Sequence, residues 1–415
     1  MRIATSELYN ASLSQMESQE TQLVSLTAEI SSGNALPNPG ANPVAAAQAV
    51  QLSATSATLT QYSANQNTAL ASLQTEGTAL TNVTSTMQSI ESLIQEAMSG
   101  GLNDTNRAAV AQQMEGYRNQ LMSLANTTDG EGNSIFSGFQ NVAQVFSNNP
   151  GGGVTYNGDA GQRSVQVSDA RNIPIGDSGA SVFMSVQALG SQAVPSGNPA
   201  NTGTGTIGAV TVTDPAAATN HDNFTIAFVQ DPDVATQLDY TVTDNNAVPP
   251  TPTTPVAYTS GASIALGSGL STTISGTPAI GDAFTVTPAT SAANTDVFAS
   301  LDSMIAALKN PADGNATALA TMNNALSTGL AQIGNSLANV TTIQASVGGR
   351  EQELQALQTA TSSSSLQITT SLSDLTGVDL ASTMTQFTEA QNALTASQKV
   401  FTATQSLTLF QYYNP

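Results

Sequence analysis

Few side chains in the 415-residue sequence have the types and spacing that catalysis requires. The single histidine, His221, precedes Asp222 in a turn before a strand-like run, and a serine–histidine–acid triad would have to use it. The Gly-X-Ser-X-Gly motif that would present such a serine is absent. We therefore interpret His221 as a surface histidine and predict that the protein is not an enzyme.

Two other segments have the composition of ligand-binding loops. Asp129 begins the run Asp-Gly-Glu-Gly-Asn, as in a calcium loop. However, Ser134 stands at the sixth position, where glycine is required, and Gln140 at the twelfth, where an acidic residue is required. The glycines at 151–153 are not followed by the Gly-Lys-Ser/Thr of a phosphate-binding loop. We predict neither a metal site nor a cofactor.

The charge balance excludes several classes of partner. Only 9% of the residues are charged, with 8 basic against 29 acidic side chains and a net charge of −21. Nucleic-acid binding needs clustered Lys and Arg, and an anionic membrane surface would repel this chain, so we predict no nucleic acid and no membrane partner. The sequence has no run of 18 apolar residues and no cysteine for a disulfide, and its first residues lack the apolar core of a cleavable signal peptide.

The elements that must position any functional surface fall into three zones of different composition. Residues at both ends are rich in Ala, Ser, Thr, Gln and Leu, whereas the middle holds most of the glycine and proline. The predicted fold class is α+β, with long coiled-coil-like helices from both chain ends forming a bundle around an inserted β-rich middle region. The expected domains are an N-terminal assembly helix and connector (1–42), two halves of a helical core (43–140 and 296–376), a β-rich outer region of one or two domains (141–295) and a C-terminal assembly helix (377–415).

Both terminal segments carry a narrow apolar seam. One helix is predicted from about Thr5 to Ser32, with Gly33 in the position of a C′ glycine, and another follows a break near Gly377. Their apolar residues recur every seven positions, which is the spacing of a coiled-coil seam. We predict that these residues form the assembly interface: Tyr9, Met16, Leu23, Ile30, Leu380, Phe387, Leu394 and Phe401.

The inner helices carry a similar seam. Asn42 is placed to cap a helix over about 43–98, and a shorter third helix begins after Asn103. Gln66 and Glu76 interrupt the apolar positions of the long helix. The predicted core seam consists of Leu52, Leu59, Leu73, Leu80, Met87, Ile94, Leu337, Val340, Val347 and Leu354.

The positions beside these seams are mostly Ser, Thr, Gln, Asn and Ala, not the Glu and Lys of a solvated coiled coil. Uncharged faces can be buried against other subunits without the cost of desolvating ions. The first helix has so thin a seam that it would fray without a partner. We interpret the seams as assembly surfaces, and the alternative at this point is a monomeric bundle with an unusually neutral surface.

The middle zone has the pattern of β-structure. Short β-branched or alternating runs are separated by turn residues, and a proline-rich loop follows one of them. The expected strands cover residues 165–167, 207–213, 224–229, 240–243 and 283–287.

The helical ends resemble those of the flagellin family. Glu29-Ile-Ser-Ser-Gly33, then Asn38 and the segment 43–50, resemble the end of the family's first helix and the start of its second. Residues 372–381 resemble the acidic turn that opens the C-terminal helix, and residues 407–411 resemble the hydrophobic tail. The resemblance leaves the middle of the chain unassigned.

Within the family, residues 124–139 favour one branch. The run Leu-Ala-Asn-Thr-Thr-Asp-Gly-Glu-Gly-Asn-Ser-Ile-Phe-Ser-Gly-Phe resembles the junction proteins between hook and filament. Filament-forming members carry an Asn-Gly-Lys-Leu-Leu type segment there, which is absent here. The start, residues 1–5, and the aromatic end, residues 410–413, are similar to the same branch. This sequence departs from the family at Ala41-Asn42-Pro43, which replaces an acidic pair, and in its longer middle.

The resemblance implies a structural subunit of the bacterial flagellum, secreted through the flagellar type III channel without a cleaved signal. It would form an adaptor ring that joins the hook to the flagellin filament. The implied partners are copies of itself in the ring, a neighbouring hook-associated protein on the hook side, flagellin on the filament side and an export chaperone.

Two other hypotheses stay open on the sequence. A flagellin with an unusual outer domain would elongate into long filaments when seeded, whereas a junction protein would not. A secreted surface-binding protein would recognise a glycan or host surface through residues 141–295, because outer domains tolerate change when a helical core carries assembly.

Overall fold

The computed structural model describes residues 2–36, 38–40, 42–99, 101–234 and 236–410. These residues form two compact units. The first combines the chain up to residue 65 with the residues from 356 onward, and the second is made of residues 66–355. Met1 and residues 411–413, which contributed to the family resemblance, lie outside the described residues.

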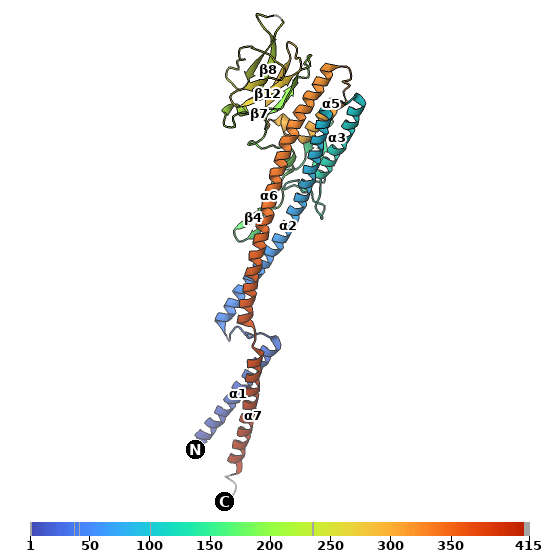
Figure 1. Ribbon diagram of the computed structural model, residues 1–415. Coiled ribbons are helices and arrows are strands. Elements are labelled where there is room, and N and C mark those ends of the chain that lie inside the picture. The colour runs from blue at the N-terminus through green and yellow to red at the C-terminus, as the bar shows by residue number, and fades with distance from the viewer. Residues whose placement is uncertain (1, 37, 41, 100, 235, 411–415) are drawn as a thin grey trace. The chain divides into compact units, whose positions relative to one another are not determined.

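Two terminal helices dominate the first unit. α1 (Arg2–Ser32) and α7 (Leu380–Phe410) lie in contact and run antiparallel, so that the start of α1 and the end of α7 lie at the same end of the pair (Figure 1). The unit also holds the first part of α2 (Pro43–Met98) and the last part of α6 (Ala316–Thr376), two long helices that continue into the second unit.

Local signals end and begin these helices as expected from the sequence. Gly33 follows α1 with φ 66°, a left-handed conformation that favours glycine. The Asn42 side chain accepts a hydrogen bond of 3.1 Å from the amide three residues later and so caps α2. The turn after α1 meets the end of α6, where the Ala35 amide donates to the Thr376 carbonyl over 2.8 Å.

The helical part of the second unit contains the rest of α2 and α6 together with α3 (Asp104–Ala125) and α5 (Val297–Lys309), which pack on each other. α2 and α6 touch where Gln344 donates to the Thr81 hydroxyl over 2.9 Å. The sequence did not separate α5 from the long helix that follows it. Asp296 caps α5 by accepting from the Phe298 amide at 2.8 Å.

Two β-hairpins and a short helix lie next to the helices (Figure 1). Their bounds are β1 (Phe146–Asn148) with β2 (Val154–Tyr156), β3 (Ser164–Ser168) with β4 (Arg171–Pro174), and α4 (Gly179–Phe183). Phe146, Phe183 and Phe298 pack together with ring centroids 5.5 to 5.9 Å apart. Through this aromatic cluster, β1 and α4 pack against α5.

The remaining strands form a sandwich of two antiparallel sheets. One sheet has the order β10-β9-β8-β13-β5, and the other has the order β11-β12-β6 with β7 also paired to β12. Buried apolar side chains from both sheets, among them Phe228, Ile264 and Phe284, share one core. The strands are β5 (Val194–Gly197), β6 (Thr206–Ile207), β7 (Thr211–Val212), β8 (Phe224–Gln230), β9 (Leu238–Asp244), β10 (Val256–Ala257), β11 (Ser263–Leu266), β12 (Leu270–Ser275) and β13 (Ala283–Thr287).

The predicted α+β class, with helices from both ends around a β-rich insertion, is confirmed. One expected strand differs, because residues 207–213 are divided between β6 and β7. The division falls at Gly208, whose amide bonds to Thr273 over 2.8 Å and whose position leaves no room for a Cβ atom, which would lie 2.7 Å from the Thr273 hydroxyl. None of the helices in the described part of the chain has the apolar stretch needed to cross a bilayer.

Candidate functional site

The contact between α1 and α7 is the first candidate surface. The rings of Tyr9 and Phe401 lie 5.1 Å apart, so residues almost 400 positions apart in the sequence meet in this pair. Among the side chains that the structure describes on the two helices, Leu26 of α1 and Ala390 of α7 are the buried apolar ones, at 4% and 8% exposure. The pair therefore has a very small core of its own.

The residues expected at the assembly interface lie along this pair but are not enclosed by it. Tyr9 and Leu380 are 46% and 55% exposed. The other six are half-buried: Met16, Leu23, Ile30, Phe387, Leu394 and Phe401. In a single chain, most of the predicted seam therefore keeps part of its apolar surface in contact with water.

Further apolar side chains on the two helices keep much of their surface exposed. Val24 and Val400 are each 65% exposed, and Leu13 and Met384 are also exposed. Side chains of this kind on both helices provide the surface that a neighbouring subunit would cover. The charge on this part is low, because uncharged polar residues fill most of the remaining positions.

The residues of the predicted core seam divide between the two units. Leu52 and Leu59, in the first unit, are half-buried. In the second unit, Leu337 is half-buried, whereas the other seam residues are at most 1% exposed: Leu73, Leu80, Met87, Ile94, Val340, Val347 and Leu354.

A row of polar side chains on α6 holds the β-sandwich. Asn324 donates to the Gly205 carbonyl at 3.0 Å and accepts from the Ile207 amide at 2.8 Å. Asn335 does the same with the backbone of Gln192, over 2.8 Å in each direction. Each asparagine amide thus reproduces the pair of bonds that a neighbouring strand would make.

Other members of the row lie between these two asparagines or, in one case, beyond Asn335. Thr328 donates to the Pro195 carbonyl at 2.7 Å, and Asn339 donates to the carbonyl of Ser181 at 2.8 Å. Gln332 donates to the Asn294 side chain at 3.0 Å. We call Asn324, Ser327, Thr328, Gln332, Asn335 and Asn339 the polar row of α6; apart from Thr328, they are all less than 10% exposed.

The two interruptions of the α2 seam have a similar role. Gln66 is fully buried and donates to the Val167 carbonyl in β3 at 2.8 Å. Glu76 is 1% exposed and accepts from the Asp177 amide at 2.8 Å. Both polar residues bind the backbone of segments from the middle zone, which explains why the heptad pattern fails at these positions.

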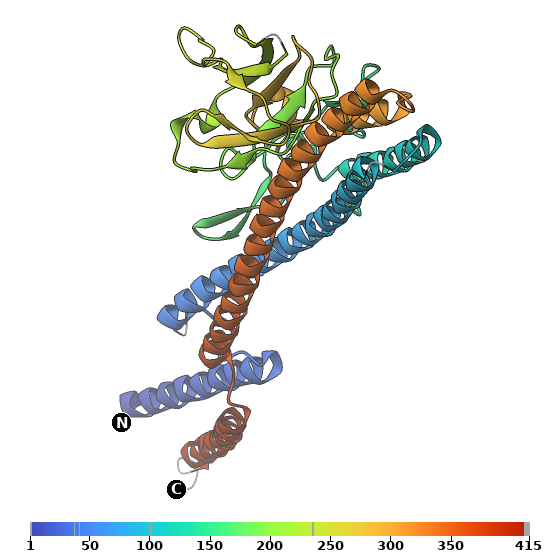
Figure 2. The same ribbon diagram turned by 45° about the horizontal axis from the view of Figure 1, so that its top comes forward.

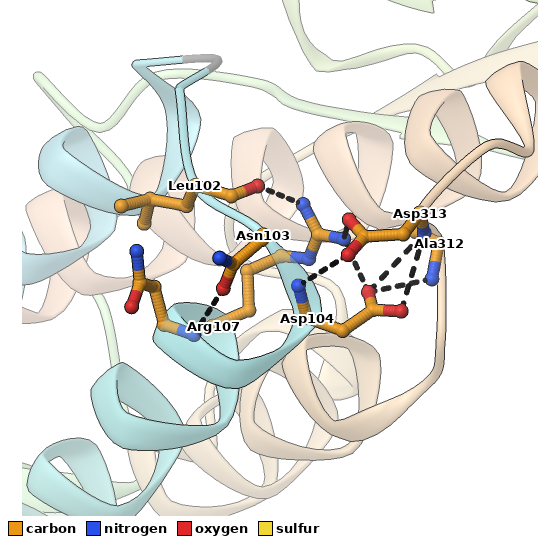
Figure 3. Close-up of polar contacts among 7 residues, drawn as sticks. Leu102, Asn103, Asp104, Arg107, Ala312 and Asp313 are labelled. Carbon is orange, nitrogen blue, oxygen red and sulfur yellow. Dashed lines mark hydrogen bonds and ion pairs between the residues drawn. The ribbon is translucent and has the colours of Figure 1, made fainter.

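A cluster of charged residues lies at the start of α3 and contacts the loop between α5 and α6 (Figure 3). Arg107, which is 3% exposed, pairs with Asp104 and with Asp313 of the loop between α5 and α6, the latter over 2.5 Å. Asp104 also accepts from the Ala312 amide at 2.9 Å. This amide, followed by the Arg107 guanidinium, lowers the pKa of Asp104. The cluster joins two loops that are about 200 residues apart in the sequence.

The segment 124–139, which distinguished one branch of the family, is a folded turn. Asn126 accepts from the Phe146 amide at 2.9 Å and donates to its carbonyl at 3.1 Å. The Asp129 carboxylate accepts from the Glu131 and Asn133 amides at 2.9 and 2.8 Å. These bonds fix the loop that places Phe136 in the aromatic cluster, 5.5 Å from Phe183, so the motif has a structural explanation.

The candidate chemical groups His221 and Asp222 lie side by side at the end of a short 3-10 turn. His221 is exposed in a 3-10 turn. Burial, followed by the nearby Asp244 charge, raises the pKa of Asp222 beside it. The described residues contain no group of three or more His, Cys, Asp or Glu arranged to hold a metal ion.

The polar row of α6 was missed by the sequence analysis. Apart from the adjacent pair Ser327 and Thr328, its residues are separated by three or four positions, which is the spacing of one helix face. A face of Asn, Gln, Ser and Thr was interpreted as a neutral surface. The density of Asn and Gln on the helix face opposite the apolar seam could have identified the row. These side chains can bind backbone groups both as donors and as acceptors.

Comparison with known proteins adds the family context. Residues 3–141 match the model of the bacterial flagellin N-terminal helical region. The chain is 29% identical to flagellar hook-associated protein 3 of Salmonella typhimurium over 413 residues, which are 99% of each chain. It is 28% identical to flagellar hook-associated protein 3 of Escherichia coli, again over 99% of both.

Solved structures give the same result. The crystal structure of FlgL from Xanthomonas campestris has a TM-score of 0.66 and 26% identity, covering 77% of this chain and 98% of that chain. The flagellar junction protein FlgL from Legionella pneumophila has a TM-score of 0.68 and 25% identity, covering 80% of this chain and 100% of that one. The resemblance inferred from the sequence is confirmed, and these matches favour the junction hypothesis over the two alternatives.

Proposed function

We propose that this chain is a structural subunit of the bacterial flagellum, an adaptor between the hook and the flagellin filament, and not an enzyme. The proteins to which it is similar over its full length are hook-associated proteins, which associate with other flagellar components. The α1–α7 pair is the observation that carries the proposal. It brings both chain ends together as one antiparallel pair whose apolar seam is only half covered.

The two units suggest separate roles in such an adaptor. The terminal pair supplies the surfaces that contact copies of the chain in a ring, a hook-associated protein on the hook side and flagellin on the filament side. The second unit has its own buried seam, and the polar row fixes its β-sandwich on α6. It would serve as a rigid body with a role distinct from that of the assembling helices.

Export is part of the proposal. We infer secretion through the flagellar type III channel to an extracellular place on the flagellum, with a chaperone that covers the terminal seams before export. The half-covered seams of α1 and α7 support a chaperone, because exposed apolar helices of this kind associate nonspecifically.

Deleting the gene tests this function. A strain without the chain should make hooks but no filaments and should release flagellin monomers into the medium. A plasmid copy of the wild-type gene should restore filaments, and a copy lacking the codons for residues 380–410 should not. Normal filaments on the deletion strain would overturn the proposal.

A seeding assay separates the junction role from that of a flagellin. Purified chain is added to filament fragments, with flagellin as the positive control. The adaptor should bind at fragment ends without forming long filaments. Elongation by this chain would favour a filament-forming role instead.

A further inference from the structure

Glu76 stands out among the carboxylates of the described residues, because it is almost fully buried at a position of α2 where the seam is otherwise apolar. It lies on α2 and is 1% exposed. One carboxylate oxygen, Oε1, accepts from the Asp177 amide at 2.8 Å. The other, Oε2, is buried without a hydrogen-bond partner among the described residues. A charged carboxylate in this position is poorly solvated.

The environment of Glu76 includes a second carboxylate and an arginine. Asp177, in the segment between β4 and α4, pairs with Arg350 of α6 and accepts from Gln162 at 2.5 Å. Arg350 also donates to the Pro174 carbonyl at the end of β4 over 3.3 Å. Three elements therefore meet here: α2, α6 and the segment that leaves the β3–β4 hairpin.

A small cavity of about 80 Å³ adjoins the two carboxylates. Its wall also contains Asp129 and Arg163, the remaining charged groups that face it, and the hydroxyl residue Thr75. A polar cavity of this size has room for a few water molecules, through which a proton can reach a buried carboxyl.

We propose that Glu76 and Asp177 form a proton-dependent latch, which holds residues 162–178 onto α2 and α6 when Glu76 is protonated and loosens when Glu76 loses its proton. Protonated Glu76 keeps its bond to the Asp177 amide and places no second negative charge beside the Asp177–Arg350 pair. Ionised Glu76 puts two carboxylates next to one guanidinium.

The pKa of Glu76 agrees with this arrangement of charged groups. Burial, followed by the negative charge of Asp177, raises the pKa of Glu76 to about 7, against the opposing effects of the Asp177 amide and Arg350. The pKa in the latched state thus lies above that of an exposed glutamate. The latch is then fully stabilised below the exposed-state pKa, and its stabilisation is lost as the pH rises from about 4.5 towards about 7.

Hydrogen exchange on the full-length protein tests the latch. Exchange of peptides from residues 162–178 is measured by mass spectrometry at pH 5.5 and pH 8 and corrected for the intrinsic effect of pH. In the wild type, the opening equilibrium constant should be on the order of tenfold larger at pH 8. In Glu76→Gln, this pH dependence should disappear.

Two further variants make the result specific. Glu353→Gln removes a half-exposed carboxylate of α6 that binds Arg171 of β4 over 2.6 and 2.8 Å. It should raise opening at both pH values and keep the wild-type pH dependence. Asp177→Asn removes the neighbouring negative charge and should move the pH dependence to lower pH.

A wild-type protein whose opening constant is the same at both pH values would overturn the proposal, even if Glu76→Gln did not fold. An unchanged pH dependence in a folded Glu76→Gln variant would also overturn it.

Discussion

Leu52 and Leu80 occupy the same heptad position of the same helix, yet their environments differ. Leu80, in the second unit, has no exposed surface, whereas Leu52, in the first unit, is half-buried. The sequence repeat is equal in both places, so the difference is in the partners. In the second unit, α6 contacts α2 at Thr81, and segments of the middle zone bind Gln66 and Glu76, whereas in the first unit the seam of α2 is only half covered by its own chain.

A heptad seam therefore predicts which residues can be buried in a contact between helices. It does not predict whether the partner helices belong to the same chain. The second unit has a complete apolar core and should stay folded in isolation. In the proposed assembly, the first unit is completed only by other molecules.

The largest effect is expected for a truncation in the finished core. Leu80→Ala should lower the free energy of unfolding of the second unit by about 2–5 kcal/mol, because it removes a fully buried side chain and leaves a cavity. Urea denaturation followed by circular dichroism measures this change. A loss below about 1 kcal/mol would mean that this part of the seam is not tightly packed.

A smaller effect is expected where the sandwich is fixed to α6. Asn324→Ala should cost about 1–3 kcal/mol, because the buried amide of Ile207 and carbonyl of Gly205 lose their partner. Hydrogen exchange should increase in β6 and leave α3 unchanged. The neighbouring Asn323→Ala, half-buried and outside the polar row, is the matched control, and an equal effect of both would contradict the role of the row.

The charged cluster at the start of α3 should contribute less and with a defined pH dependence. The pKa of Asp104 is lowered in the folded state, so its contribution is present above the unfolded-state pKa and is lost as the pH falls through the folded-state pKa. Asp104→Asn should lower Tm at pH 7, and this loss should become smaller as the pH falls. Glu115→Gln, which removes only the exposed pair with Lys309, should lower Tm less at pH 7.

The smallest effect on the monomer is expected in the terminal pair. Leu23→Ala should change monomer stability by less than about 1 kcal/mol, because the side chain is only half-buried. The same variant should reduce filament formation when it replaces the wild-type gene. A large loss of monomer stability with normal filaments would reverse the roles assigned to the two units.

Most of the helices could be predicted from the sequence, because their signals are local. Gly33, Asn42 and Asn103 mark helix ends through backbone conformation or capping, and apolar spacing marks the seams. These signals need no information about distant residues.

The polar contacts could not be predicted in the same way. Asn324, Gln66 and Glu76 bind backbone groups about 100 or more residues away in the sequence, so their partners become visible only once the chain is folded. Their buried state was hidden by their residue type, since a polar side chain on a helix is usually exposed. The division of residues 207–213 into two strands had the same cause, a close approach of distant backbone at Gly208.

We infer that the terminal helices are surfaces that other molecules complete. Limited proteolysis can test this inference. Full-length chain, shown to be monomeric by light scattering, is digested briefly, and the fragments are identified by mass spectrometry. In the monomer, we expect rapid loss of about the first 30 and last 40 residues, with residues 66–355 intact, and in the assembled flagellum both ends should be protected. Equal resistance of both ends in the monomer would show that α1 and α7 complete their burial within one chain, which would contradict the claim.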